Sequence, residues 1–166
     1  MAKEFWVNRR APTLTVGEFH VSHHRCWPWD LDLWLELNNG RALTLYDLGR
    51  LVLAKRTGLL SLLKEKGWSM PMAGASVRYR RRVHVFEGFE MRSRGLCWDE
   101  RFFYIEQSMW KKNGECAGHI VYRSAFVDKT GIINPDIVIE SLGEKVERPS
   151  IPNWINKWIE AENNRP

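Results

Sequence analysis

Cysteine is scarce in this sequence, and the three cysteines present, Cys26, Cys97 and Cys116, show no C-x-x-C spacing. Such a sparse and odd-numbered set argues against a disulfide framework and against a cysteine-bound zinc site. Long apolar runs are absent too, because no stretch approaches the roughly 20 residues that cross a bilayer. The N-terminus also lacks a basic segment followed by an apolar one, so we expect an unexported, cytoplasmic protein without a membrane span.

Hydrophobic and aromatic residues, by contrast, are plentiful. The chain of 166 residues is 44% hydrophobic and 12% aromatic, with 9 tryptophans. This length and composition predict one globular domain over residues 1–166, because little would remain for a second core. The formal net charge of +5 predicts a surface that attracts anions, whether nucleic acid, anionic lipid or a phosphorylated small molecule.

The first part of the chain predicts a strand, a loop and a long helix. Residues 13–25 are rich in β-formers and are interpreted as the first strand. Asn38-Asn39-Gly40 supplies good N-cap residues for a helix over 41–56, which contains no proline and is stopped by Gly58. Leucines cover more than one face of this helix, which indicates burial on nearly all sides. Residues 59–66 either prolong the helix or form a separate short one.

The rest of the chain is mainly β in character. Alternating residues predict four long strands, over 72–83, 84–97, 101–112 and 115–127. An Asn-Gly pair predicts a two-residue hairpin turn between the last two strands, and the four together are expected to form an antiparallel meander. A helical extension is expected from about residue 134. Because so apolar a helix must be covered, the fold class is predicted to be α+β, with the sheet wrapped around the helix.

The loop before the long helix carries the most informative motif. Asp30 and Asp32 are followed, after a spacer, by Asn38 and Asn39. This resembles the D-x-D, spacer, N-N-x-x-Y-L signature of hotdog thioesterases of the 4-hydroxybenzoyl-CoA and acyl-carrier-protein type, with Ala42 in place of the tyrosine. The resemblance implies a hotdog fold, in which an antiparallel sheet of five to six strands wraps a long central helix. It also implies hydrolysis of acyl-CoA to free acid and CoA, with no metal or cofactor.

Thioester hydrolysis needs a carboxylate that attacks or activates water, and donors that hold the oxyanion. A helix N-terminus supplies unpaired amides, here near Asn38, Asn39 and Gly40. The family resemblance assigns the catalytic role to Asp32. Many relatives carry His at the position of Glu36, so Glu36 either replaces it as a second carboxylate or marks a member with lost or weakened catalysis.

Other titratable residues are interpreted as structural. Asp30 suits a turn cap or an ion pair, and the spacing of Asp47 to Arg50 indicates an ion pair within the helix or across a dimer. His23 and His24 are neighbours in a strand, so their side chains face opposite ways and cannot share one metal ion.

A basic strand is expected at Arg78 to Arg82, with Arg92 and Arg94 beside it on the next strand. Alternation puts Arg80 and Arg82 on one face, which makes them the candidates for binding the phosphates of CoA. An exposed basic sheet face that keeps the edge soluble is the alternative.

Three functions follow from these patterns. The leading hypothesis is an acyl-CoA thioesterase with an apolar slot beside the helix for the acyl chain. The second is a non-catalytic protein of the same fold that binds acyl-CoA or acyl carrier protein. Nucleic-acid binding through the basic strands is disfavoured, because a net charge of +5 is modest. A homodimer or a dimer of dimers is expected, since hotdog domains of this type commonly pair their sheets edge to edge.

Overall fold

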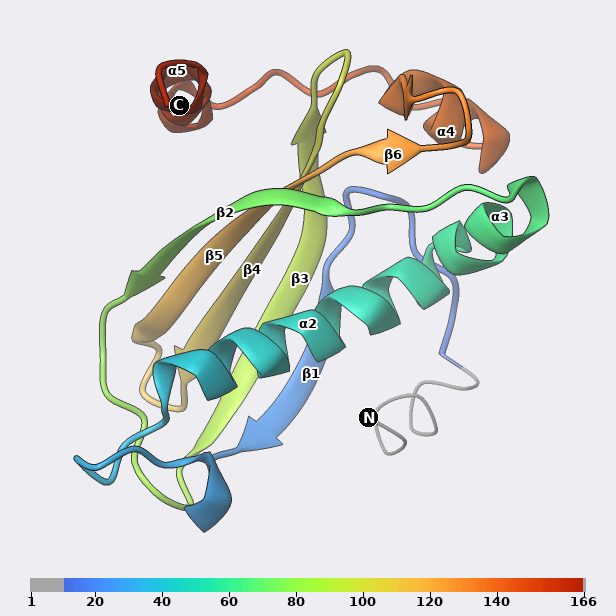
Figure 1. Ribbon diagram of the computed structural model, residues 1–166. Helices are drawn as coiled ribbons and strands as arrows, with labels where there is room; N and C mark the ends of the chain where they lie inside the picture. The colour runs from blue at the N-terminus through green and yellow to red at the C-terminus, as the bar shows by residue number, and fades with distance from the viewer. Residues whose placement is uncertain (1–10, 166) are drawn as a thin grey trace.

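The computed structural model describes residues 11–165 and contains a five-stranded antiparallel sheet with a long helix lying against it (Figure 1). The strand order is β1-β3-β4-β5-β2. The N-terminal segment in which no export signal is expected, residues 1–10, lies outside the described part of the chain. The predicted α+β class, with a sheet wrapped around a central helix, is confirmed.

The elements have the following bounds. The sheet consists of β1 His20–Arg25, β2 Met72–Tyr79, β3 Gly88–Trp98, β4 Phe103–Lys111 and β5 Cys116–Ser124. The helical elements are the 3-10 turn η2 Pro28–Asp30, α2 Asn39–Arg56, α3 Leu59–Lys66, α4 Pro135–Ser141 and α5 Asn153–Asn163. Two short strands form a separate pair, β6 Phe126–Val127 and β7 Ile132–Ile133.

Helix α2 begins and ends where its flanking residues dictate. The side-chain oxygen of Asn38 accepts hydrogen bonds from the amides of Gly40 (2.9 Å) and Arg41 (3.1 Å), which confirms the predicted N-cap. After the helix, Gly58 has a φ of 77°, a left-handed conformation that glycine adopts at little cost and that ends the helix. Residues 59–66 therefore form the separate helix α3.

Burial of α2 agrees with its leucine pattern. Within the helix the exposed residues are Asn39, Gly40 and Thr44, all in its first turns. From residue 45 to residue 56 every side chain is buried or half-buried. The sheet covers one side of the helix, and α3 packs against it as well (Figure 1).

Gly49 lets α2 lie close to the sheet. A β-carbon at Gly49 would lie 2.8 Å from Nε2 of Gln107 and 3.0 Å from both Sδ of Met91 and Oγ of Ser93. Gln107 is fully buried and donates to the carbonyl oxygen of Tyr46 (2.8 Å) and to Ser93 Oγ (2.7 Å). Because a buried amide must find partners, these hydrogen bonds fix the helix over β3 and β4.

Strand β1 is shorter than the sequence pattern predicts. The expected strand over 13–25 forms only in its second half, because the earlier residues turn toward the end of α2. There the amide of Leu14 donates to the carbonyl oxygen of Arg56 (3.0 Å). Val16 keeps one bond to the sheet, accepting from the amide of Gly95 (2.9 Å).

The predicted four-stranded meander is wrong for one strand. β3, β4 and β5 form a meander, but β2 pairs with β5 at the sheet edge. The chain after β2 crosses back to β3 past the loop before α2, where the amide of Leu37 donates to the carbonyl oxygen of Val83 (2.8 Å). Two strands therefore separate the basic segment 78–82 from Arg92 and Arg94, which the sequence pattern placed beside it.

The turn between β4 and β5 also differs from its prediction. Lys111 and Glu115 close it through the Lys111 amide, which donates to the Glu115 carbonyl oxygen (2.9 Å), so the loop is 112–114 rather than two residues. Gly114 has a positive φ of 84°, whereas Asn113 does not and instead uses its side chain to accept from the Glu115 amide (3.1 Å). The Asn-Gly pair thus marks the turn but builds one with a single left-handed residue.

The C-terminal helices form as expected. Asn134 caps α4 by accepting from the amide of Asp136 (2.9 Å). In α5, Ile155 is fully buried and packs with Tyr104 and Val121. The sequence neighbours of these strand residues belong to the core around α2, so α5 covers the opposite face of the sheet.

Candidate active site

The loop that carries the predicted catalytic acids folds into a tight hairpin over residues 31–37. The amide of Asp32 donates to the carbonyl oxygen of Glu36 (2.9 Å). Oδ1 of Asp32 accepts from the amides of Trp34 (2.9 Å) and Glu36 (3.4 Å). One carboxylate oxygen thus holds the turn, and Oδ2 has no hydrogen-bond partner among residues 11–165.

Glu36 reaches from this hairpin toward the basic segment after β2. Its Oε2 lies 2.9 Å from Nε of Arg82, with the Glu36 side chain 23% exposed and the Arg82 side chain 71% exposed. The backbone of Glu36 also pairs with that of His84. The structure therefore brings one predicted carboxylate into contact with one predicted CoA-binding arginine.

The amides at the start of α2 are not equally available. The Asn38 side chain occupies those of Gly40 and Arg41, and the Asn38 amide itself donates to the carbonyl oxygen of Asp30 (2.8 Å). The Asn39 amide has no acceptor among the described residues. It is therefore the free donor of the predicted set, at the positive end of the helix dipole.

Asp30 has the structural role that its position indicates. The side chain is 3% exposed, lies 2.5 Å from Nε of Arg41 and accepts from the amide of Trp27 (2.9 Å). Breaking such a buried pair would leave an uncompensated charge. Asp30 thus ties the turn η2 to the first turn of α2.

A cleft of about 230 Å³ opens between the start of α2, the end of β2 and the strands β4 and β5. The predicted site residues that line it are Glu36, Asn39, Arg80 and Arg82. Asp32, Asn38 and Gly40 are not part of its lining. The basic segment and the helix start, which are far apart in the sequence, therefore meet at one cleft.

Tyr46 also lines this cleft, and the sequence analysis missed it. Tyr46 is 1% exposed, and its hydroxyl has no hydrogen-bond partner among the described residues. A β-carbon at Gly118 on β5 would lie 2.8 Å from that hydroxyl, so the glycine leaves room for it. Burial raises the pKa of Tyr46 well above its ordinary value, so the hydroxyl keeps its proton. A tyrosine among helix leucines looks like any core residue, and no sequence signal distinguishes it.

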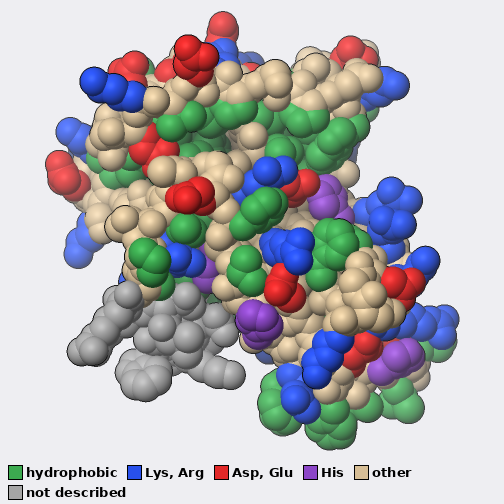
Figure 2. Space-filling model, turned by 180° about the vertical axis from the view of Figure 1, so that it is seen from behind, with side chains coloured by type: hydrophobic (Ala, Val, Ile, Leu, Met, Phe, Trp, Pro, Cys, Tyr) green, Lys and Arg blue, Asp and Glu red, His purple; other side chains and the backbone are tan. Residues whose placement is uncertain are grey.

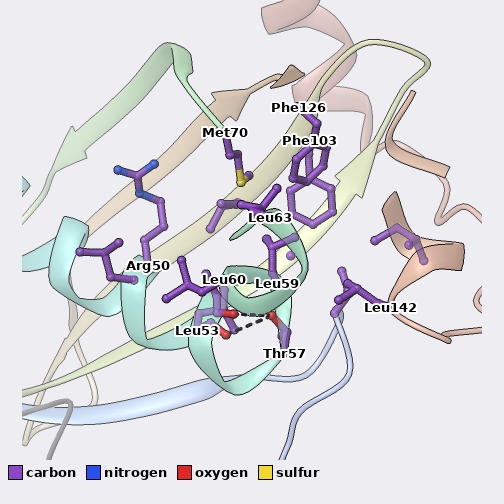
Figure 3. Close-up of a pocket in the computed structure, with 16 residues that line it drawn as sticks. Arg50, Leu53, Thr57, Leu59, Leu60, Leu63, Met70, Phe103, Phe126 and Leu142 are labelled. Atoms are coloured by element: carbon purple, nitrogen blue, oxygen red, sulfur yellow. Dashed lines mark hydrogen bonds between the residues drawn. The ribbon is translucent and has the colours of Figure 1, made fainter. Parts of the chain in front are cut away.

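A second cavity, of about 240 Å³, lies at the other end of α2 (Figure 3). Its apolar walls include Leu53, Leu59, Leu63, Met70, Phe103 and Phe126. Arg50 borders it, but its guanidinium points away from the leucines in Figure 3. That guanidinium lies 3.0 Å from Oδ1 of Asp47 and 5.1 Å from the ring centre of Tyr122, so the predicted intrahelical ion pair forms.

Residues 11–165 contain no group of three His, Cys, Asp or Glu side chains that could hold a metal ion. Nδ1 of the buried His20 lies 3.1 Å from Nη1 of Arg56, and His23 lies 3.5 Å from Glu90.

In residues 11–165, no helix combines the length and the apolar character needed to cross a bilayer.

Comparison with known proteins identifies the family. The model of the thioesterase-like superfamily matches residues 26–159, and the chain belongs to this superfamily. It is 36% identical over 133 residues to Protein THEM6 of Xenopus laevis. That match covers 80% of this chain and 63% of the frog protein, so the chain spans less than two thirds of this relative's length.

Solved structures show the fold. YbaW of Escherichia coli superposes with a TM-score of 0.70 at 14% identity, covering 76% of this chain and 98% of YbaW. The DHNA-CoA thioesterase of Staphylococcus aureus superposes with a TM-score of 0.62 at 13% identity, covering 87% of this chain and 91% of that enzyme. These similarities confirm the hotdog fold that the motif implied.

Proposed function

We propose that this protein hydrolyses acyl-CoA thioesters to free acid and CoA in the cleft between the start of α2 and the end of β2. The lining of that cleft is the observation that carries the proposal. A carboxylate (Glu36), a free helix amide (Asn39) and a buried hydroxyl (Tyr46) all border it. These are the base and the oxyanion donors that thioester hydrolysis requires. Membership of the thioesterase-like superfamily supports the same chemistry.

The base or nucleophile in this proposal is a carboxylate of the 31–37 hairpin. Asp32 is favoured by the family resemblance, and its Oδ2 is not used by the turn. Glu36 is favoured by its place in the cleft lining. The two carboxylates are close neighbours, because the Glu36 amide donates to Oδ1 of Asp32. As a base, the carboxylate takes a proton from the attacking water, the carbon–sulfur bond breaks, and the CoA thiolate takes up that proton. As a nucleophile, it attacks the carbonyl carbon and forms an anhydride while the carbon–sulfur bond breaks and the CoA thiolate leaves. Water then cleaves the anhydride, which releases the acid, restores the carboxylate and supplies the proton that the thiolate takes up.

The oxyanion on the thioester carbonyl is proposed to be held by the Asn39 amide and the Tyr46 hydroxyl. Donors that are fixed before the reaction stabilise developing charge without having to reorganise. The raised pKa of Tyr46 keeps its hydroxyl protonated at neutral pH, so it can donate. No metal or cofactor takes part.

Substrate binding is proposed to use both ends of α2. Arg80 and Arg82 at the rim of the cleft bind the CoA phosphates, since guanidinium groups pair well with phosphate oxygens. The acyl chain enters the apolar cavity of Figure 3, because an apolar cavity of more than about 150 Å³ can hold an apolar ligand.

A homodimer would bring the cleft and the apolar cavity together. Along α2, Asn39 and Arg50 are separated by about 16 Å of helix rise. Tyr79, at one end of the edge strand β2, donates to the Asn39 carbonyl oxygen (3.1 Å), whereas Met70, just before the other end, lines the apolar cavity. When two β2 edges pair antiparallel, the cleft of one chain meets the apolar cavity of the other. We therefore propose a homodimer paired through β2, with a dimer of dimers as the larger assembly.

Release of CoA from a panel of acyl-CoAs, from acetyl to palmitoyl, tests the proposed activity. A reagent that reacts with the free thiol measures the rate. We expect release to be fastest with aliphatic chains long enough to enter the apolar cavity. Equal rates with and without protein for every member of the panel would contradict hydrolysis.

A non-catalytic acyl-CoA-binding or acyl-carrier-protein-binding protein is the second candidate. The ion pair of Glu36 with Arg82 favours it, because the guanidinium occupies the carboxylate oxygen Oε2 that would otherwise face water in the cleft. Saturable binding of palmitoyl-CoA in calorimetry, without any thiol release, would support this candidate over the enzyme.

A further inference from the structure

Large apolar side chains protrude from the end of the molecule at which α2 begins. The most exposed are Leu33 (93%), Trp34 (73%) and Trp29 (72%). Figure 2 shows hydrophobic side chains gathered at the lower end of the molecule, with lysine and arginine beside them. We name this group the apolar tip, and its members are Trp27, Trp29, Leu33, Trp34, Leu35, Val85 and Phe86.

The apolar tip is a built feature that three segments form together. The Trp27 ring stacks on Trp29 (5.5 Å between centroids) and meets Phe86 edge-on (6.1 Å). The amide of Phe86 donates to the carbonyl oxygen of Cys26 (2.7 Å). The 31–37 hairpin joins the same group, because Glu36 forms a backbone bridge with His84, which directly precedes Val85 and Phe86.

Backbone conformation at the tip is unusual as well. Among the described non-glycine residues, positive φ values occur at Leu35 (59°) and Phe86 (61°), and both belong to the tip. Bulky residues adopt this region at an energetic cost. The fold thus holds apolar side chains outward at positions where strain and exposure both disfavour them.

Three cations that have no acidic partner among the described residues lie at the end of the molecule that carries the tip. Most acids at this end are paired with a cation: Glu36 with Arg82, Glu87 with Lys111, Glu115 with Arg81 and Asp30 with Arg41. Asp32 is the exception, because its carboxylate binds only backbone amides among residues 11–165. Among residues 11–165, no ion pair neutralises Arg25, Arg80 or Lys112. The Arg25 guanidinium lies 6.0 Å from the Trp27 ring centre, so one of these cations is part of the tip itself.

We propose that the apolar tip docks this protein on the surface of a lipid bilayer that contains anionic lipids. Tryptophan favours the headgroup level of a bilayer, and leucine gains free energy by entering the acyl region just below it. Arginine and lysine near the surface add attraction to anionic headgroups. A protruding tip fits a fluid surface that yields to it, whereas a protein partner would need a matching hollow. The proposal does not depend on catalysis at the neighbouring cleft.

Sedimentation of the full chain with vesicles tests the docking. One set of vesicles contains phosphatidylcholine with phosphatidylserine, and the other contains phosphatidylcholine alone. The double variant Leu33→Ser/Trp34→Ser is expected to lower the partition coefficient about tenfold or more on both sets. Arg25→Gln is expected to weaken binding only to the vesicles with phosphatidylserine.

The matched control is Ile132→Ser/Ile137→Ser, which removes two apolar side chains of 45% and 51% exposure near α4, away from the tip. It should bind vesicles as the wild type does. Thermal melting checks the fold of each variant, and Trp29→Ser replaces the double variant if the hairpin fails to fold.

Three results would overturn the proposal. The first is a wild-type protein that stays in solution with both vesicle types. The second is a tip variant that binds the vesicles as tightly as the wild type. The third is a tip variant that changes from dimer to monomer in light scattering while neither protein binds vesicles. That result would assign the tip to a contact between copies of the chain.

Discussion

The Tyr46 hydroxyl is buried at the cleft that the proposed reaction uses, and no residue from 11 to 165 gives it a hydrogen-bond partner. An unsatisfied buried hydroxyl costs about 1–3 kcal/mol of stability. A fold can offset that cost when the group binds substrate instead of protein. At the residue scale, Tyr46 is therefore where stability and proposed function oppose each other.

Replacing Tyr46 with Phe separates these two effects. Loss of one oxyanion donor is expected to lower kcat about a hundredfold, with a smaller effect on KM. The melting temperature should stay unchanged or rise, because an unpartnered polar atom has been removed. Kinetics of CoA release and thermal melting measure both, and an unchanged kcat would remove Tyr46 from the proposed site.

His20 predicts a pH dependence of stability. Burial, and secondarily the Arg56 guanidinium, lower the pKa of His20 from 6.5 to about 4. Between pH 6.5 and about 4 the unfolded chain binds a proton that the folded chain does not, so stability falls as the pH falls. At about 1.4 kcal/mol per pKa unit, this loss reaches about 3 kcal/mol.

Urea unfolding at pH 7 and pH 4.5 measures the effect of His20. The variant His20→Gln should lose less stability between the two values than the wild type does. His23→Gln is the control, since the His23 side chain is 78% exposed. Equal losses in the wild type and His20→Gln would show that another group sets the dependence.

The candidate site could be predicted where its residues are close in the sequence. Glu36 and Asn39 follow from the loop motif, and Arg80 and Arg82 from their alternation in a basic segment. Tyr46 could not be predicted, because its role depends on the cleft beside Gly118, on a strand far along the chain. The Asn38 side chain occupies the Gly40 amide, so this amide is not a free oxyanion donor. That contact depends on side-chain geometry, which a sequence motif does not contain.

At the scale of elements, Gly49 determines how closely α2 packs against the sheet. By helix propensity alone, Gly49→Ala should raise the free energy of unfolding by about 1 kcal/mol. It also drives a β-carbon into Gln107, Met91 and Ser93, and such overpacking typically costs about 1–3 kcal/mol. We expect a net loss of stability.

Denaturant unfolding of Gly49→Ala checks this balance, with Thr44→Ala at an exposed position of the same helix as control. The control should be neutral or slightly stabilising. A Gly49→Ala protein more stable than the wild type would mean that the sheet yields to the new methyl group.

The fold was predictable at the level of elements and less so in their pairing. The caps at Asn38, Gly58 and Asn134 set helix bounds by local chemistry, which a sequence contains. The pairing of β2 with β5 joins segments about 40 residues apart in the sequence, and local patterns could not distinguish it from a simple meander. For the same reason, the β-former Leu14 did not reveal that its amide binds the end of α2.

At the scale of the whole molecule, the edge strand β2 controls the proposed dimer. Ala75 is exposed in the middle of that edge. Ala75→Lys should raise the dimer dissociation constant about tenfold or more, because it places like charges opposite each other in a symmetric pair. Light scattering over a range of concentrations measures this, with Glu65→Lys on α3 as control. A wild-type protein that is monomeric throughout would contradict the paired-edge proposal.

The proposed hydrolysis depends on a carboxylate of the 31–37 hairpin, and kcat for CoA release tests that dependence most directly. The assay compares the wild type with Asp32→Asn, Glu36→Gln and the exposed control Glu65→Gln, each checked for folding by thermal melting. We predict that Asp32→Asn or Glu36→Gln lowers kcat by about 10² to 10⁴ and that Glu65→Gln does not. Wild-type kcat in both hairpin variants would contradict the proposed mechanism.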